Sequence, residues 1–227
     1  MKSNFNILTG RENVFLEIYD GFFVHKEILL SLNKLFSYAK KELNADLKII
    51  SGFRDFDKQL FIWNSKATGK RKIIDENEQP VDIQNLCDEA LFNYIARFSA
   101  IPGLSRHHWG TDLDIYDANK LTKDKVQLTH SECISEGPFA ELHSWLDEVI
   151  RDNRSFGFFR PYDIDFGGIA QEKWHLSYKP ISDKFYDDYN IDIFKRNIEL
   201  SDIEIKSYIL NNIDEIFHKY FKLINKA

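Results

Sequence analysis

Histidines and carboxylates are concentrated in two short segments of the chain. The first, from Ser105 to Asp114, reads SRHHWGTDLD and places His107 and Asp114 on either side of a glycine that lets the chain turn. The second, EKWH, adds Glu172 and His175. Two neutral imidazoles and one carboxylate are a common protein ligand set for catalytic zinc, with the fourth position left for water. The sequence therefore predicts a zinc site made by His107, Asp114 and His175.

Glu172 is predicted to be the catalytic base of this site. Zinc polarises a peptide carbonyl and lowers the pKa of a bound water toward about 7, so a carboxylate that is not a ligand is needed to take the proton. Strict pleating would place Glu172 and His175 on opposite faces of a strand. We therefore expect Glu172 to lie in the loop before that strand or in a distorted entry to it.

The residues around these groups allow several interpretations. Asp112 could be an alternative ligand, a surface carboxylate, or a partner that orients a ligand histidine, and we favour the last. His108 could contact substrate, pack in the core or face solvent. Trp174 is predicted to pack and to hold its segment rigid. His130 and His143 belong to no motif, and we expect them at the surface.

Hydrophobic periodicity predicts the elements that position the site. A helix is expected over residues 24–44 and a strand over Leu47–Phe53, which leads into a loop carrying Arg54. Asp55 is expected to cap a helix from Phe56 toward Lys66.

The rest of the chain is predicted to alternate between helices and loops. Residues 70–82 show no period and are expected to form an exposed loop. Helices are expected over residues 86–98 and 139–150, a strand over Lys173–Tyr178, and a long C-terminal helix from a capping box at Ser201. The pattern predicts an α+β fold, in which a small antiparallel sheet carries the zinc site between flanking helices. We expect a peptidase domain over residues 1–180 and a helical C-terminal extension over 181–227, packed on the same domain.

Three segments together resemble the VanY-type D-alanyl-D-alanine carboxypeptidases and the related D-Ala-D-Ala dipeptidases. The family signatures SxHxxGxxxD and ExWH match the segments that begin at Ser105 and Glu172. The upstream Ser-Gly-Tyr-Arg segment of the family, with a glutamine on the next helix, resembles residues 51–54 and Gln59. The sequence departs from the family pattern at Phe53, His108, Trp109 and Asp112, which affects substrate choice more than metal binding.

The resemblance implies roles for individual residues. It implies one zinc ion per chain on His107, Asp114 and His175, with Glu172 as the base. It also implies substrate contacts from Ser105, Gln59 and Arg54, the last of which either stabilises the developing oxyanion or engages the substrate. A guanidinium suits both tasks, although Arg54 could instead form a weak exposed pair with Asp55 or Asp57.

The resemblance implies hydrolysis near the C-terminus of peptidoglycan stem peptides or of similar small peptides with D-amino acids, with D-Ala-D-Ala or L,D specificity. Alternatives of the same fold are a D,D-dipeptidase and a wall endopeptidase. A different class is a zinc-binding recognition module without catalysis. Glu172 argues against that class, because a structural zinc site needs no spare base.

Composition limits the partners and the compartment. The 227 residues are 43% hydrophobic and 29% charged, which is typical of a globular protein, and the net charge of -6 does not favour nucleic acid. We expect no membrane span, because no segment approaches the required length of about 20 apolar residues. The N-terminal segment, charged at Arg11, Glu12 and Glu17, lacks the apolar region of a secretory signal. The sequence alone thus predicts a cytoplasmic protein, whereas the resemblance implies action in the periplasm or cell wall.

Overall fold

A four-stranded antiparallel sheet forms the centre of the molecule. The computed structural model describes residues 4–226 and places the strands in the order β3 (Leu47–Ser51), β4 (Asp112–Asp117), β6 (His175–Tyr178) and β5 (Phe158–Phe159). Each strand pairs antiparallel with its neighbours. The two inner strands, β4 and β6, are those that carry the histidine and carboxylate motifs. The predicted α+β fold with a small antiparallel sheet is confirmed.

The N-terminal part of the chain forms a hairpin that the sequence analysis missed. Strands β1 (Leu16–Tyr19) and β2 (Phe22–His25) are joined at Asp20 and Gly21, both of which have positive φ. An Asp-Gly pair between two segments rich in strand-forming residues favours this tight turn, and this pair is the sequence feature from which the hairpin could have been predicted. The helix predicted from residue 24 therefore begins later: β2 is followed by a 3₁₀ turn, η1 (Lys26–Ile28), and by α2 (Leu29–Leu43).

Three predicted helices and the long loop are confirmed. The helices are α3 (Phe56–Ala67), α4 (Asp88–Phe98) and α6 (Ala140–Arg151). The carboxylate of Asp55 caps α3 by accepting a hydrogen bond of 2.7 Å from the backbone N–H of Lys58. Residues 70–82 contain neither helix nor strand, apart from an isolated bridge between Ile74 and Pro80. The remaining short elements before the C-terminal region are α1 (Phe5–Leu8), η2 (Arg106–Trp109), η3 (Lys123–Lys125) and α5 (His130–Cys133).

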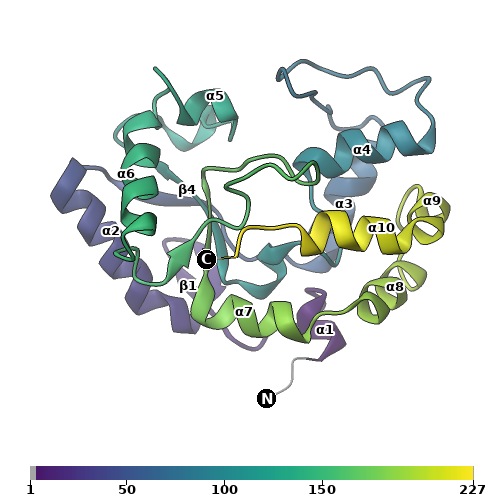
Figure 1. Ribbon diagram of the computed structural model, residues 1–227, viewed down its shortest axis with the longest axis horizontal. Helices are drawn as coiled ribbons and strands as arrows, with labels where there is room; N and C mark the ends of the chain where they lie inside the picture. The colour runs from purple at the N-terminus through teal and green to yellow at the C-terminus, as the bar shows by residue number, and fades with distance from the viewer. Residues whose placement is uncertain (1–3, 227) are drawn as a thin grey trace.

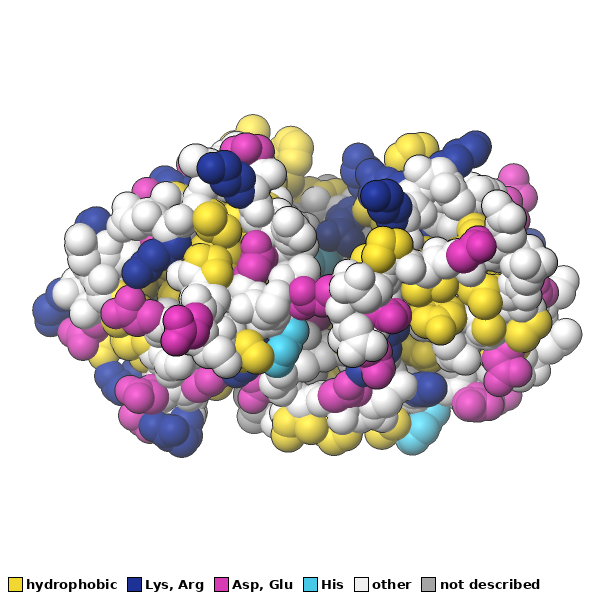
Figure 2. Space-filling model, turned by 90° about the horizontal axis from the view of Figure 1, so that it is seen from above, with side chains coloured by type: hydrophobic (Ala, Val, Ile, Leu, Met, Phe, Trp, Pro, Cys, Tyr) yellow, Lys and Arg dark blue, Asp and Glu magenta, His cyan; other side chains and the backbone are white. Residues whose placement is uncertain are grey.

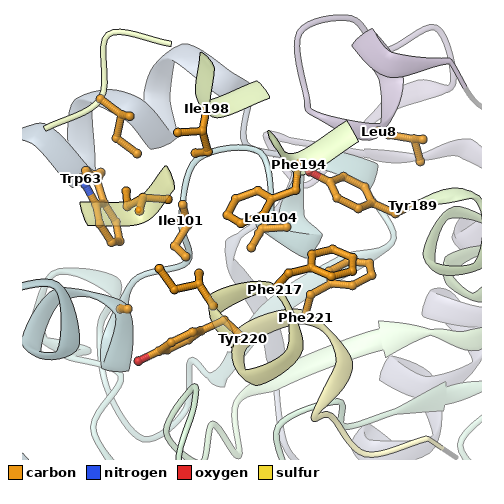
Figure 3. Packing of buried hydrophobic residues seen from close by; sticks show 14 of the residues in the cluster. Leu8, Trp63, Ile101, Leu104, Tyr189, Phe194, Ile198, Phe217, Tyr220 and Phe221 are labelled. Atoms are coloured by element: carbon orange, nitrogen blue, oxygen red, sulfur yellow. The ribbon is translucent and has the colours of Figure 1, made fainter. Parts of the chain in front are cut away.

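Helices cover the sheet from two sides, and each side has its own hydrophobic cluster (Figure 1). On one side, α2 and α6 pack against the sheet through buried residues such as Leu35, Leu146 and Leu113. On the other side lie α3, α4 and the C-terminal helices, whose cluster includes Trp63, Leu104 and Phe217 (Figure 3). The ligand-bearing strands thus lie between two packed layers, which is the rigid support that a metal site requires.

The prediction of one long C-terminal helix that begins at Ser201 is wrong. The region instead contains α7 (Lys179–Asp188), α8 (Ile191–Glu199), α9 (Lys206–Asn211), α10 (Ile213–Phe217) and a π-helical turn, η4 (His218–Lys222). The side chain of Asn64, on α3, donates to the Asp202 carbonyl and accepts from the Glu204 N–H, at 2.9 Å in each case. It thereby takes the N–H group that Ser201 would bind in the expected capping box. Tertiary contacts therefore override the local helical pattern. The domain boundary at residue 180 stays a prediction.

His143 contradicts the expectation that it lies at the surface. It is only 1% exposed within α6, and its Nδ1 accepts a hydrogen bond of 3.1 Å from Arg160. Burial, together with the charges of Arg160 and Lys173, lowers the pKa of His143 well below its usual value of 6.5. The imidazole is therefore neutral in the folded protein at neutral pH.

This buried histidine predicts that stability falls in weak acid. Below about pH 6.5 the unfolded chain binds a proton at His143, whereas the folded chain does not. The contribution of the buried neutral His143 to the free energy of unfolding is therefore complete above that pH, and it decreases as the pH falls toward the lower pKa of the folded state. Between pH 7.5 and 5.5 the free energy of unfolding of the metal-free protein should fall by about 1 kcal/mol more than that of the His143→Asn variant. The asparagine keeps a hydrogen-bond acceptor for Arg160. Urea denaturation at both pH values measures this difference. Equal losses in the two proteins would show that His143 does not titrate as argued.

Candidate metal centre

The structure brings the three predicted ligands to one point. His107 lies in η2, Asp114 in β4, and His175 opposite Asp114 in the register of β4 and β6. His107 Nε2 is 3.3 Å from Asp114 Oδ2, and His175 Nδ1 is 3.3 Å from Asp114 Oδ1. All three residues are buried, and one ligand atom from each lies within 4.8 Å of the others. The residues are therefore close enough to bind a single ion.

Gly110 makes the turn between η2 and β4 that allows this convergence. Its φ is +70°, in the left-handed region that favours glycine. A Cβ atom there would lie 2.8 Å from Leu16 and 3.0 Å from the backbone nitrogen of His25. The Gly110 carbonyl also accepts a hydrogen bond of 2.8 Å from that nitrogen. The N-terminal hairpin therefore packs directly on the turn and fixes it.

Hydrogen bonds orient both imidazoles toward Asp114. His107 donates from Nδ1 to the carbonyl of Gly52 at 2.9 Å, because a carbonyl can only accept, and this leaves Nε2 with a free lone pair. His175 Nε2 lies 3.0 Å from Asp112 Oδ1, so donation to that carboxylate leaves Nδ1 free. Metal-binding histidines usually donate their second N–H to a carboxylate or a carbonyl in this way.

The donor set fits a divalent cation of the zinc type. Asp114 Oδ1 is buried and accepts no hydrogen bond from residues 4–226, so the oxygen has a lone pair available for an ion. Burial would raise the pKa of Asp114, but His107 and His175 outweigh it and lower that pKa, which keeps the carboxylate charged. Burial would likewise lower the pKa of His175, yet the hydrogen bond with Asp112 and the adjacent carboxylates of Asp114 and Glu172 raise it well above the usual value. The negative charge that stabilises a proton on this imidazole suits a metal ion equally well.

Asp112 is fully buried and connects His175 to Arg106 through hydrogen bonds. Besides His175, it accepts hydrogen bonds of 2.7 Å from Arg106 Nε and from the Thr111 hydroxyl. Arg106 also donates to Ser177 at 2.6 Å. Burial would raise the pKa of Asp112, but the charge of Arg106 and the His175 hydrogen bond lower it, so the carboxylate stays ionised. Arg106 is a residue whose contribution the sequence analysis missed.

Glu172 lies outside the strand, as predicted. Strand β6 begins at His175, two residues later than expected, because Lys173 and Trp174 belong to a turn closed by the His175 N–H and the Glu172 carbonyl at 3.3 Å. The Glu172 side chain is 17% exposed, and its Oε2 lies 3.3 Å from His175 Nδ1. The carboxylate therefore reaches the metal centre while keeping contact with solvent.

Arg54 and Gln59 form a polar wall that the Arg54 backbone joins to the segment carrying His107. Arg54 donates to the side chain of Gln59 at 2.8 Å and to Ser51 at 2.9 Å, and its backbone N–H donates to the His107 carbonyl at 3.1 Å. Within residues 4–226 no carboxylate lies within 4 Å of its guanidinium, so the pair with Asp55 or Asp57 does not form. Ser105 Oγ is buried and has no hydrogen-bond partner in the described part of the chain.

His108 has a packing role. It is fully buried, its Nδ1 donates to the Arg54 carbonyl at 2.6 Å, and its Nε2 accepts from the backbone N–H of Gly103 at 3.0 Å. Burial, the largest cause, lowers the pKa of His108 to about 3. The neutral ring therefore ties the Arg54 segment to η2. His130, by contrast, is exposed, as expected.

A cavity of about 510 Å³ lies beside the Glu172 segment. Trp174, buried as expected, lines this cavity together with Gln171, Phe98 and Ile164. Glu78, another lining residue, accepts hydrogen bonds from the backbone N–H and the hydroxyl of Ser131 at 3.2 and 2.9 Å. The volume lies within the range of small-ligand pockets. Figure 2 shows a hollow between two raised halves of the surface, with Lys or Arg side chains on one of its walls.

Curated relatives share parts of the sequence. An uncharacterised protein of Haemophilus influenzae is 28% identical over 123 residues, which cover 53% of this chain and 92% of the relative. A second uncharacterised protein of that organism is 42% identical over 65 residues, covering 29% of this chain and 43% of the relative.

Solved structures share the fold. VanYB in complex with D-alanine-D-alanine superposes with a TM-score of 0.53 at 22% identity, covering 82% of this chain and 90% of that chain. A mutant of the vancomycin resistance D,D-pentapeptidase VanY, in complex with Zn(II), superposes with a TM-score of 0.51 at 23% identity. The superposition covers 87% of this chain and 90% of that chain. At this identity the likeness shows a common fold. The family model described as VanY, D-alanyl-D-alanine carboxypeptidase, matches residues 21–181, and the chain therefore belongs to this family.

Proposed function

We propose that the protein is a zinc-dependent carboxypeptidase that hydrolyses a peptide bond near the C-terminus of peptidoglycan stem peptides. One zinc ion per chain would be held by His107, Asp114 and His175. The observation that carries the proposal is the convergence of two imidazole lone pairs and one carboxylate, with the Glu172 carboxylate 3.3 Å from one of those nitrogens. A buried ligand set with a further carboxylate beside it fits hydrolysis better than a structural site.

The chain's own residues would divide the remaining chemistry. When bound, zinc supplies Lewis acidity toward the scissile carbonyl. Glu172 takes a proton from the attacking water and returns it to the leaving amine, a role for which its partial exposure to solvent is suitable. Arg54, which has no carboxylate partner within the described residues, can direct N–H groups at the developing oxyanion. Gln59 holds that guanidinium in place. The buried Ser105 hydroxyl, which has no hydrogen-bond partner within residues 4–226, is available to a substrate group that enters the centre.

The relatives and the cavity support a peptide substrate. One structural neighbour binds D-alanine-D-alanine and another binds Zn(II), and both ligands suit the centre described above. The cavity beside Trp174 borders the segment that carries Glu172, and its volume of about 510 Å³ can hold further residues of a stem peptide.

A panel of peptides tests the proposal. The purified protein is incubated with a stem pentapeptide, a stem tetrapeptide and free D-Ala-D-Ala, with and without chelator, and released D-Ala is measured. Chelator-sensitive release from a stem peptide supports the carboxypeptidase, and the preferred peptide gives the D,D or L,D specificity. Release from the dipeptide alone would replace the proposal by a dipeptidase. Bound zinc without any release would indicate a recognition module.

A further inference from the structure

Lys66 lies on the same wall as Arg54, one hydrogen-bonded step further along α3. Arg54 donates to Gln59, and Gln59 in turn donates from Nε2 to the carbonyl of Ala100 at 2.5 Å. Ser99, the neighbour of Ala100, accepts a hydrogen bond of 2.6 Å from Lys66 Nζ. The ammonium group and the guanidinium are thus fixed to a single short stretch of backbone that follows α4.

The positive charge of Lys66 has no counter-ion in the described protein. Lys66 is partly buried, and no carboxylate of residues 4–226 lies within 4 Å of its nitrogen. Burial lowers its pKa to about 8, the charges of Arg71 and Arg54 act in the same direction, and Glu172 opposes them. The ammonium group is therefore close enough to Arg54 and Glu172 to be influenced by the charges of both. A partly buried cation without a partner is costly for the free protein and suits an anionic ligand.

We infer that Lys66 binds the C-terminal carboxylate of the peptide substrate and so determines the preference for a free chain end. The inference rests on the proposed function. Lysine supplies a compact charge with three donors, of which Ser99 uses one. With the carboxylate bound there, the guanidinium of Arg54 is left for the oxyanion, which separates the two roles that a single arginine would otherwise share. In this role Lys66 determines specificity and takes no part in proton transfer.

Paired substrates test this inference. The Lys66→Met variant is compared with the wild type on a stem peptide ending in a free carboxylate and on the same peptide ending in a carboxamide. We expect kcat/KM for the acid to fall about 10- to 100-fold, mainly through KM, and the value for the amide to change less than about twofold. Lys58→Met, on the exposed face of α3, is the matched control and should change neither value.

Binding measurements keep the inference separate from the proposed activity. Zinc-loaded Glu172→Gln protein, with and without Lys66→Met, is titrated calorimetrically with both peptides. Loss of the preference for the acid in the double variant supports the inference, even if the wild type hydrolyses neither peptide. Equal weakening of acid and amide, or an unchanged preference, would overturn it. Zinc content and circular dichroism of each variant confirm that the fold is retained.

Discussion

The Glu172→Gln variant is expected to lose about 10²- to 10⁴-fold in kcat while it keeps its metal. Glutamine has nearly the shape of glutamate but cannot take a proton from water at neutral pH. Glu172 is not among the three residues that converge on the candidate metal position, so zinc content should stay near that of the wild type. Steady-state kinetics on the preferred peptide, with zinc measured on the same samples, give both values.

Glu136→Gln is the control for this experiment. Glu136 is exposed and far from the site residues in sequence, so its replacement should leave kcat unchanged. If Glu172→Gln keeps wild-type kcat, Glu172 is not the base. If it loses zinc together with activity, the carboxylate acts as a ligand, and the division of roles proposed above is wrong.

Replacing Asp112 by asparagine is expected to have the largest effect on stability. The change leaves the Arg106 guanidinium, 3% exposed at the side chain, without its charged partner. Breaking one side of a buried ion pair costs about 3–5 kcal/mol. Since Asp112 also receives the His175 hydrogen bond, zinc affinity should fall by about 10- to 100-fold. Denaturant unfolding and competition with a chelating dye measure the two effects.

Asp117→Asn supplies a matched comparison on the same strand. Asp117 is also buried, but its carboxylate accepts hydrogen bonds from the backbone N–H groups of Asp46 and Asn119, which an amide oxygen can accept equally well. Its replacement should cost about 1 kcal/mol or less and leave zinc affinity unchanged. Equal destabilisation by the two substitutions would contradict the special role given to the Arg106–Asp112 pair.

The residues of the candidate site were easier to predict from the sequence than the residues that surround and orient them. His107, Asp114, His175 and Glu172 could be selected from sequence because zinc hydrolysis demands particular residue types, and because the two motifs fall on strands that pair. Arg106 could not be selected, since a charged side chain beside a histidine is usually exposed and its second partner, Ser177, is 71 residues away. Lys66 carries no motif either. Only the fold shows that it lies on the same wall as Arg54.

Local pattern predicted helices well where their ends are determined locally. Helix α3 begins where Asp55 caps it, which a sequence can reveal. The C-terminal region failed because Asn64, more than a hundred residues earlier, binds the backbone where the helix was expected to start. Of the aromatic residues of that region, Tyr208 and Tyr220 pack against Phe92 of α4. Phe217 and Phe221 instead pack against Tyr189 (Figure 3). Among residues 4–226, no helix has the length and apolar character needed to span a membrane.

Titration of metal-free protein with zinc tests the central claim most directly. The chelator-treated protein is supplied with increasing zinc, and both bound zinc and D-Ala release from the preferred stem peptide are measured at each step. The account predicts that activity is absent without metal, rises in proportion to bound zinc, and reaches its maximum at one ion per chain, and that His107→Ala abolishes both binding and activity. Full activity of the metal-free protein, or zinc binding that survives the loss of His107, would contradict it.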